Sequence, residues 1–162
     1  MSSSSETAKA HRAAVRDFAI SVDIAAPPPV VWAVMRDVER WPEWTTTVTR
    51  IERLDSGPLT VGSRLRIRQP KLLPADWTVT EIADDRGFKS ITRGPGISVT
   101  AHHWIAPIER GSRVTLSIQF HGALGGLIAR LTRRLNTEYL GIEAAGLKRR
   151  AEERARDSAM SA

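Results

Sequence analysis

In the stretch DFAISVDI (residues 17–24), hydrophobic residues occupy every second position, so one side of the segment is apolar and the other mostly polar. This alternation is typical of a half-buried β-strand. Prolines end the strand, and the apolar spacing of VVWAVMRDV predicts a short helix directly after them, since proline is tolerated in a first helical turn. The following RWPEW predicts about one more helical turn, with Pro42 acting as a breaker.

Residues 47–121 predict six further strands, separated by turn signals such as DSGP, DDRG, GPG and ERGS. One of them, SRLRIRQ, alternates Leu65 and Ile67 with three arginines, which indicates one dry and one wet side. Because the turns are short, the strands are expected to form an antiparallel meander.

The period changes in the last segment, where leucines and isoleucines recur at three and four residues and predict one long amphipathic helix over about residues 123–155. Gly141 and Gly146 lie inside it, and each costs up to about 1 kcal/mol relative to alanine. They therefore indicate either a close approach to the sheet or a bend. The helix is the natural cover for a curved sheet, and we expect a cavity where the straight helix and the curved sheet do not match.

Length and composition predict one globular domain over residues 17–156, with flexible tails at 1–16 and 157–162. The net charge of +6 is spread among mixed signs, so nucleic-acid binding is not expected. No apolar run approaches the ~20 residues of a membrane span. The N-terminus lacks the apolar core of a signal peptide, which predicts a cytoplasmic protein, and we expect a monomer or a homodimer.

The order of elements and several motifs resemble the START-like (SRPBCC) superfamily, which includes polyketide cyclases/dehydrases and lipid-transport proteins. The stretch IAAPPPVVWAVMRDVERWPEW is similar to the family's opening motif, and DWTVTEI, HHWIAPIERGSRVTL and the final helix also match. The resemblance implies an α+β helix-grip fold: about seven curved antiparallel strands wrapped on the C-terminal helix, with two short helices after the first strand. Family members range from enzymes to carriers, so a fold of this kind does not specify a chemistry.

If the apolar face of each strand points at the helix, a largely apolar cavity forms that suits a small lipophilic or aromatic ligand. Alternatively, the same side chains pack solidly as core. The candidate ligand-binding residues are Met35, Trp41, Leu65, Ile67, Gln69, Trp77, Val79, Ala101, Ile105, Leu116, Ile118, Phe120, Leu127, Leu131 and Leu135.

Three polar residues are candidates for catalysis: His103, Glu81 and Tyr139. Alternation in VTAHHWI places His103 inside and His102 outside, and a buried neutral imidazole suits a general acid or base. Alternatively, His103 is satisfied by a neighbouring group. Glu81 either partners His103 or reaches solvent, and Tyr139 either points its hydroxyl into the cavity or keeps it at the edge.

Cofactor and metal motifs are missing, so neither group is expected. The stretch GALGG lacks the spacing of a nucleotide-binding loop, and the histidines form no zinc-binding pattern. Three functions stay open: a polyketide cyclase or dehydratase that uses acid/base catalysis, a non-catalytic lipid or quinone carrier or sensor, and an interaction module that uses the basic end of the helix. The first two share a small hydrophobic molecule as partner.

Trp41 and Trp44 lie three residues apart, on the same side of a helical turn. We expect Trp41 to form the end wall of the cavity and Trp44 to anchor the turn onto the sheet.

Overall fold

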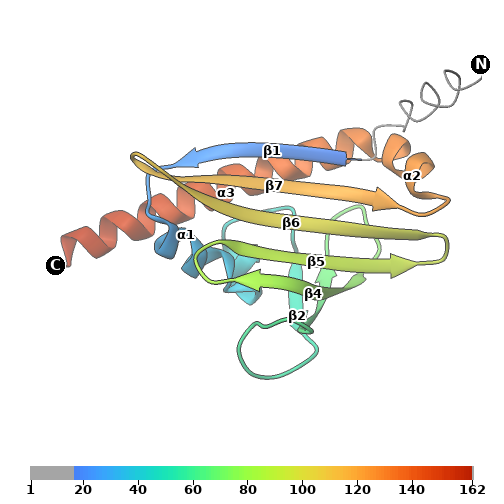
Figure 1. Cartoon of the computed structure of the whole chain (residues 1–162), viewed down its shortest axis with the longest axis horizontal. Helices are drawn as coiled ribbons and strands as arrows, with labels where there is room; N and C mark the ends of the chain where they lie inside the picture. The colour runs from blue at the N-terminus through green and yellow to red at the C-terminus, as the bar shows by residue number, and fades with distance from the viewer. Residues whose placement is uncertain (1–16, 162) are drawn as a thin grey trace, which may run out of the picture.

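The computed structural model describes residues 17–161, in which strands form one seven-stranded sheet with the order β1-β7-β6-β5-β4-β3-β2 (Figure 1). Every neighbouring pair is antiparallel, so the chain meanders from β2 to β7, and β1 adds to the far edge beside β7. The strands are β1 (Asp17–Ile24), β2 (Arg50–Arg53), β3 (Arg64–Arg68), β4 (Ala75–Ala83), β5 (Gly87–Gly94), β6 (Ile97–Ile108) and β7 (Gly111–His121). The expected α+β helix-grip fold is confirmed. The expected tail at residues 1–16 lies outside the described residues.

Two short helices follow β1, as the sequence predicts: α1 (Pro28–Met35) and the 3₁₀ helix η1 (Val38–Glu43). Pro28 and Pro29 occupy the first turn of α1, where a missing N–H costs no intrahelical hydrogen bond. Pro42 lies inside η1, a short 3₁₀ helix with few intrahelical hydrogen bonds for its missing N–H to remove.

The prediction of one helix over 123–155 is wrong at both its middle and its end. The structure has α2 (Gly125–Leu131) and α3 (Arg133–Met160), which meet at Thr132. The Thr132 hydroxyl donates to the Ile128 carbonyl at 2.7 Å, and Asn136 Nδ2 donates to that hydroxyl at 2.9 Å. Side-chain bonds of this kind bend a helix. At the other end α3 continues to Met160, so residues 157–160, expected in a tail, are helical.

Helix α3 contacts β1, β7 and α1, and it passes behind β1 and β7 in the view of Figure 1. Gly146 allows this helix to approach η1 closely, because a Cβ there would lie 2.1 Å from the Trp44 carbonyl oxygen. The Arg149 guanidinium donates to the same oxygen at 3.0 Å. Trp44 therefore joins the end of η1 to α3, and η1 also contacts β2. That Trp44 itself anchors the turn onto the sheet stays a prediction. Gly141 has no neighbour within 4 Å of a built Cβ, so the two glycines differ in role.

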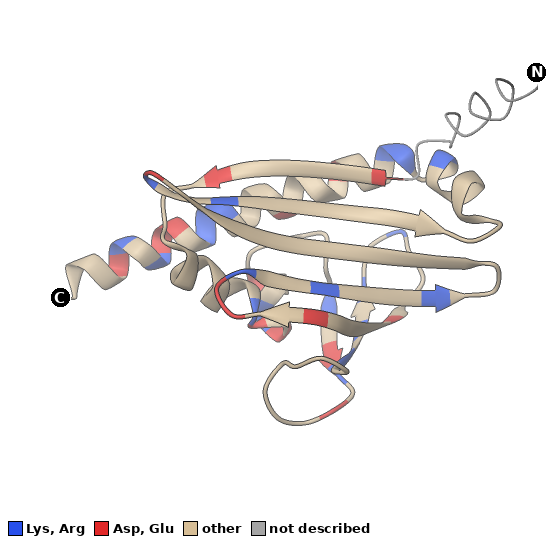
Figure 2. Cartoon of the chain, viewed as in Figure 1, with Lys and Arg blue, Asp and Glu red and all other residues tan. Residues whose placement is uncertain are grey.

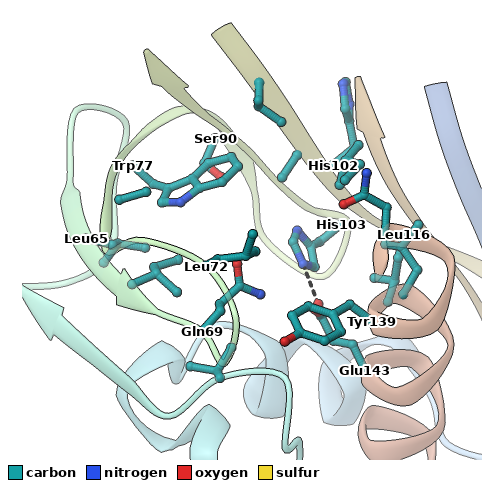
Figure 3. A pocket seen from close by; sticks show the side chains of 18 of the residues that line it. Leu65, Gln69, Leu72, Trp77, Ser90, His102, His103, Leu116, Tyr139 and Glu143 are labelled. Atoms are coloured by element: carbon teal, nitrogen blue, oxygen red, sulfur yellow. Dashed lines mark hydrogen bonds and ion pairs between the residues drawn. The ribbon is translucent and has the colours of Figure 1, made fainter. Parts of the chain in front are cut away.

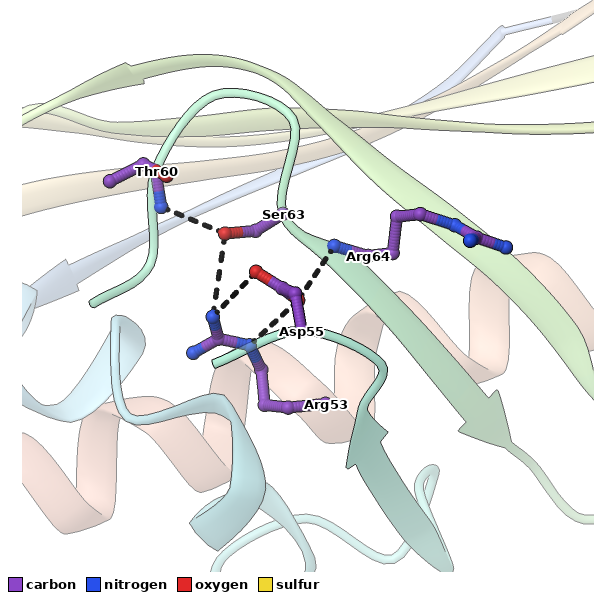
Figure 4. A network of polar contacts seen from close by, with 5 residues as sticks. All are labelled: Arg53, Asp55, Thr60, Ser63 and Arg64. Atoms are coloured by element: carbon purple, nitrogen blue, oxygen red, sulfur yellow. Dashed lines mark hydrogen bonds and ion pairs between the residues drawn. The ribbon is translucent and has the colours of Figure 1, made fainter. Parts of the chain in front are cut away.

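A polar network holds the loop between β2 and β3 (Figure 4). The Arg53 guanidinium donates to Asp55 at 3.0 Å and to the Ser63 hydroxyl at 3.4 Å. The backbone N–H of Arg64 donates to Asp55 at 3.0 Å, and that of Thr60 donates to Ser63 at 3.0 Å. The hydrogen bond from the Arg53 side chain, followed in size of effect by the one from the Arg64 backbone, lowers the pKa of Asp55 to about 2. This network fixes the entry into β3, which forms one wall of the site.

Candidate functional site

A cavity of about 280 Å³ lies between the inner face of the sheet, η1 and the two C-terminal helices. Its walls are mainly apolar and aromatic, which suits a hydrophobic ligand. The residues predicted for the cavity that do line it are Trp41, Leu65, Ile67, Gln69, Trp77, Ala101, Leu116, Ile118 and Phe120. Register explains the convergence, because Ala101 pairs with both Ser90 on β5 and Ile118 on β7, which brings three strands' inward residues side by side.

A hydrogen-bonded polar pair lies in this mainly apolar wall, His103 on β6 and Glu143 on α3 (Figure 3). His103 Nε2 lies 2.8 Å from Glu143 Oε1, and both side chains are nearly nine-tenths buried. The imidazole stacks on Phe88 with ring centroids 4.8 Å apart and lies 5.1 Å from the Trp41 ring. Trp41 is fixed in turn by its indole N–H, which donates to the Met35 carbonyl at 2.9 Å. The aromatic contacts hold the imidazole in the one orientation that reaches Glu143.

The hydrogen bond between His103 and Glu143 has a defined direction. A carboxylate oxygen accepts hydrogen bonds, so His103 Nε2 is the donor in this contact. The other ring nitrogen, Nδ1, is sealed from solvent and has no hydrogen-bond partner among the described residues. Glu143 lines the cavity, and its second oxygen, Oε2, accepts no hydrogen bond from residues 17–161.

The mouth of the cavity lies between the loop connecting β3 to β4 and the start of α3. Leu72 and Leu73 border it from the loop, and Tyr139 borders it from the helix. The Tyr139 hydroxyl donates to the Pro70 carbonyl and so ties the helix to the loop. Burial, followed by the nearby Glu138 charge, raises the pKa of Tyr139, which keeps the hydroxyl protonated as a donor. Tyr139 thus lines the site, with its hydroxyl engaged at the edge.

Glu81 lies away from the site: of its two expected placements the structure has the one that reaches solvent, so Glu81 does not partner His103. The register of β4 against β5 shifts between Val79 and Glu81, so the alternation counted from Trp77 fails at that point. Glu81 is exposed and pairs with Lys89, whose Nζ lies 3.0 Å from its carboxylate.

Six predicted ligand-binding residues do not line the cavity. Met35, Val79 and Ile105 are fully buried in the core. Leu127 and Leu131 are exposed because α2 turns its Ile128 and Ala129 inward instead, and Leu135 is half-buried just beyond the bend at Thr132. The break between α2 and α3 rotates the leucine stripe away from the cavity.

Sequence reasoning missed Glu143, Phe88, Ser90 and the loop leucines of the mouth. A signal for Glu143 was present, because Asn136, Tyr139 and Glu143 follow one another at three and four residues and so share a helix face. Among the described residues, no three His, Asp or Glu side chains gather closely enough to hold a metal ion. His102 belongs to the other face of β6, where its Nδ1 accepts from the Trp104 indole at 3.4 Å. Burial, followed by the Lys89 charge, lowers the pKa of His102.

Comparison with known proteins gives a family for the chain. The sequence profile of the family described as "Polyketide cyclase / dehydrase and lipid transport" matches residues 16–152. No curated protein sequence matches significantly.

Solved structures support the fold. The Zhui aromatase/cyclase from Streptomyces sp. R1128 superposes with a TM-score of 0.70 at 17% identity, covering 88% of this chain and 96% of the other. The di-domain aromatase/cyclase StfQ of the steffimycin pathway gives a TM-score of 0.69 at 14% identity, covering 96% of this chain and 55% of the larger protein. Norcoclaurine synthase from Thalictrum flavum gives 0.66 at 14% identity, covering 85% of this chain and 94% of the other. At these identities the likeness shows a shared fold.

Proposed function

Since the chain belongs to the polyketide cyclase/dehydrase and lipid transport family, we propose that it binds a small hydrophobic molecule in its cavity and moves a proton on that molecule with the Glu143–His103 pair. The observation that carries the proposal is the 2.8 Å bond between these two side chains in a mainly apolar wall. A nearly buried imidazole–carboxylate pair is weak as a stabilising device, so its presence in a cavity points to chemistry.

Glu143 is the proton-transferring group in this proposal, and His103 is the positioning residue. Glu143 lines the cavity and its Oε2 accepts no hydrogen bond from residues 17–161, whereas Nδ1 of His103 is sealed. Oε2 removes a proton from the carbon next to a ligand carbonyl, and the electron pair of the broken C–H bond forms the enolate. The enolate carbon attacks a second carbonyl group of the same ligand molecule and closes a ring. Glu143 then returns the proton to the resulting alkoxide. Gln69, which also faces the cavity, offers an amide N–H to the first carbonyl oxygen (Figure 3).

The size of the cavity limits the ligand. An apolar cavity of about 150 Å³ accommodates benzene, and the cavity here measures about 280 Å³. A molecule the size of two fused rings therefore fits inside, with any longer chain extending through the mouth. Aromatic or alicyclic ketones of that size are the ligand class that matches both the volume and the few polar groups of a mainly apolar wall.

A non-catalytic carrier is the second candidate, and one observation favours it. Nδ1 of His103 is sealed and the Tyr139 hydroxyl is engaged by Pro70, so few polar groups are free to take part in a reaction. A carrier needs the cavity and a polar group to orient the ligand, but no proton transfer.

Hydrogen–deuterium exchange of 2-tetralone in D₂O, followed by proton NMR, separates the two candidates. This bicyclic ketone fits the cavity and exchanges its α protons only through an enolate. The wild-type protein should accelerate exchange over buffer, and Glu143→Gln should lose about 100-fold of that acceleration. The affinity of Glu143→Gln for 2-tetralone, measured by quenching of tryptophan fluorescence, should equal that of the wild-type protein. Glu138→Gln is the matched control on the exposed side of the same helix.

If the wild-type protein binds 2-tetralone without accelerating exchange, or if Glu143→Gln accelerates exchange equally, the acid/base role is rejected. The carrier function then remains as the candidate. Failure of the wild-type protein to bind 2-tetralone or any other apolar probe, together with native mass spectra of freshly purified protein that lack a bound small molecule, would reject both candidates.

A further inference from the structure

The surface around the cavity mouth carries large leucines that are exposed to solvent. Leu73 is 88% exposed on the loop between β3 and β4, while Leu127 and Leu131 are 57% and 75% exposed on α2. Leu72 and Leu124, also exposed, complete a set of five that we name the mouth patch. Leu72 and Leu73 share the lining of the cavity with Ile128 of α2, so the loop and the helix flank the same opening. Exposed leucines gathered at an opening are typical of an interaction surface.

Basic residues surround the mouth patch: Lys71 beside its loop leucines, and Arg130, Arg133 and Arg134 on and after α2. Figure 2 shows the arginines where α2 meets α3. All four are exposed, and none forms an ion pair with any residue from 17 to 161. The acidic residue closest in sequence to the three arginines is Glu138.

Three cations at the basic end of α3 are engaged within the molecule, unlike those around the mouth patch. Lys148 pairs with Glu152 at 2.7 Å, Arg150 pairs with Glu43 at 3.4 Å, and Arg149 donates to the Trp44 carbonyl. The four cations around the mouth keep their charges available to an external partner, directly beside the leucines.

We propose that the mouth patch docks onto an anionic lipid bilayer, with the leucines in the interfacial region and the four cations against the headgroups. Apolar residues that project beside lysine and arginine are the combination that binds such a surface. The most exposed leucines, Leu73, Leu127 and Leu131, project from two separate elements, the loop and α2, which suits a deformable apolar layer better than the fixed pockets of a protein. No helix of residues 17–161 is both long and apolar enough to cross a bilayer, so the contact is peripheral.

Docking in this orientation would place the cavity mouth against the lipid. A hydrophobic ligand could then enter from the bilayer without passing through water. This consequence rests on the proposed function, whereas the docking itself does not.

Co-sedimentation of the full chain with vesicles tests the proposal. The wild-type protein should bind phosphatidylcholine vesicles that contain phosphatidylserine, bind pure phosphatidylcholine far less, and be released by salt. Arg130→Gln with Arg134→Gln should weaken binding about 25-fold, from about fivefold for each arginine near the surface. Leu73→Ser with Leu131→Ser should weaken it about tenfold or more. Val61→Ser and Arg110→Gln are controls at exposed positions elsewhere, and both should bind like wild type.

Four outcomes would overturn the proposal. The first is a wild-type protein that ignores anionic vesicles, and the second is equal binding by the mouth-patch variants and the controls. The third is binding to soluble polyglutamate but not to vesicles, which would assign the surface to an acidic protein. The fourth is a dimer in analytical ultracentrifugation that Leu127→Ser with Leu131→Ser dissociates, which would assign it to a second copy of the chain. Because 2-tetralone binding is measured without lipid, the proposed function can fail or stand independently.

Discussion

Gly146→Ala should destabilise the protein, although alanine is the better helix former. A Cβ at this position would lie 2.1 Å from the Trp44 carbonyl oxygen and 3.1 Å from its carbon, and both are backbone atoms that cannot rotate away. The helix preference of alanine contributes about 1 kcal/mol in favour of the variant. Forcing extra volume into a packed contact costs about 1–3 kcal/mol, and more where the backbone must shift. Because 2.1 Å is far inside van der Waals contact, the second effect should win, with a net loss of about 1–2 kcal/mol.

Gly141→Ala is the matched control in the same helix. Nothing lies within 4 Å of a built Cβ there, so only the helix preference changes. This variant should gain up to about 1 kcal/mol. Urea unfolding, followed by circular dichroism, measures the free energy of unfolding of both variants. The two curves are fitted with the same dependence of that free energy on urea concentration.

The displacement caused by Gly146→Ala should also reach the cavity. Trp44 lies against Trp41 with ring centroids 5.4 Å apart, and Trp41 forms part of the cavity wall. The variant should therefore bind 2-tetralone more weakly than Gly141→Ala does. If Gly146→Ala gains stability as Gly141→Ala does, the contact between α3 and the Trp44 carbonyl is not close-packed and the reasoning is refuted.

Two further predictions concern the mouth and the loop between β2 and β3. Tyr139→Phe removes the hydrogen bond to the Pro70 carbonyl, so it should speed both entry and release of 2-tetralone in stopped-flow fluorescence, and lower stability by about 1 kcal/mol; unchanged rates would show that this contact does not restrict the mouth. Because Arg53 and Arg64 lower the pKa of Asp55 from its usual 3.8 to about 2, its contribution to stability is present above pH 3.8 and disappears as the pH falls through 2. At neutral pH the wild-type protein should therefore have a larger free energy of unfolding in urea than Asp55→Asn. This difference should disappear as the pH falls from 3.8 to 2; a difference that stays constant would contradict the role of the carboxylate.

The fold could be predicted well from the sequence because it depends on local patterns. Alternating residues such as Leu65 and Ile67 place one strand face inward, and short turns leave antiparallel pairing as the simple outcome. His103 was placed on the inner face by the same alternation, and the structure has it there. These inferences hold wherever a strand keeps its period of two without interruption.

The errors lie where a local period breaks. One extra residue in β4 moved Glu81 off the inner face, and no pattern in DWTVTEI marks that irregularity. The final helix is interrupted at Thr132, whose hydroxyl donates to the Ile128 carbonyl, and Leu127 and Leu131 on the short helix before it are exposed. Each shift is small, yet it reverses which side of an element meets the core.

The amino-acid sequence by itself determined the elements, their order and the inward face of most strands, because those follow from the spacing of neighbouring residues. Only the tertiary structure decided that Glu143 meets His103, since the two lie forty residues apart on different elements. It also decided which leucines enclose a ligand and which face outward around the mouth. Contacts between distant segments depend on how the helix packs on the sheet. The spacing of apolar residues within either segment does not determine that packing.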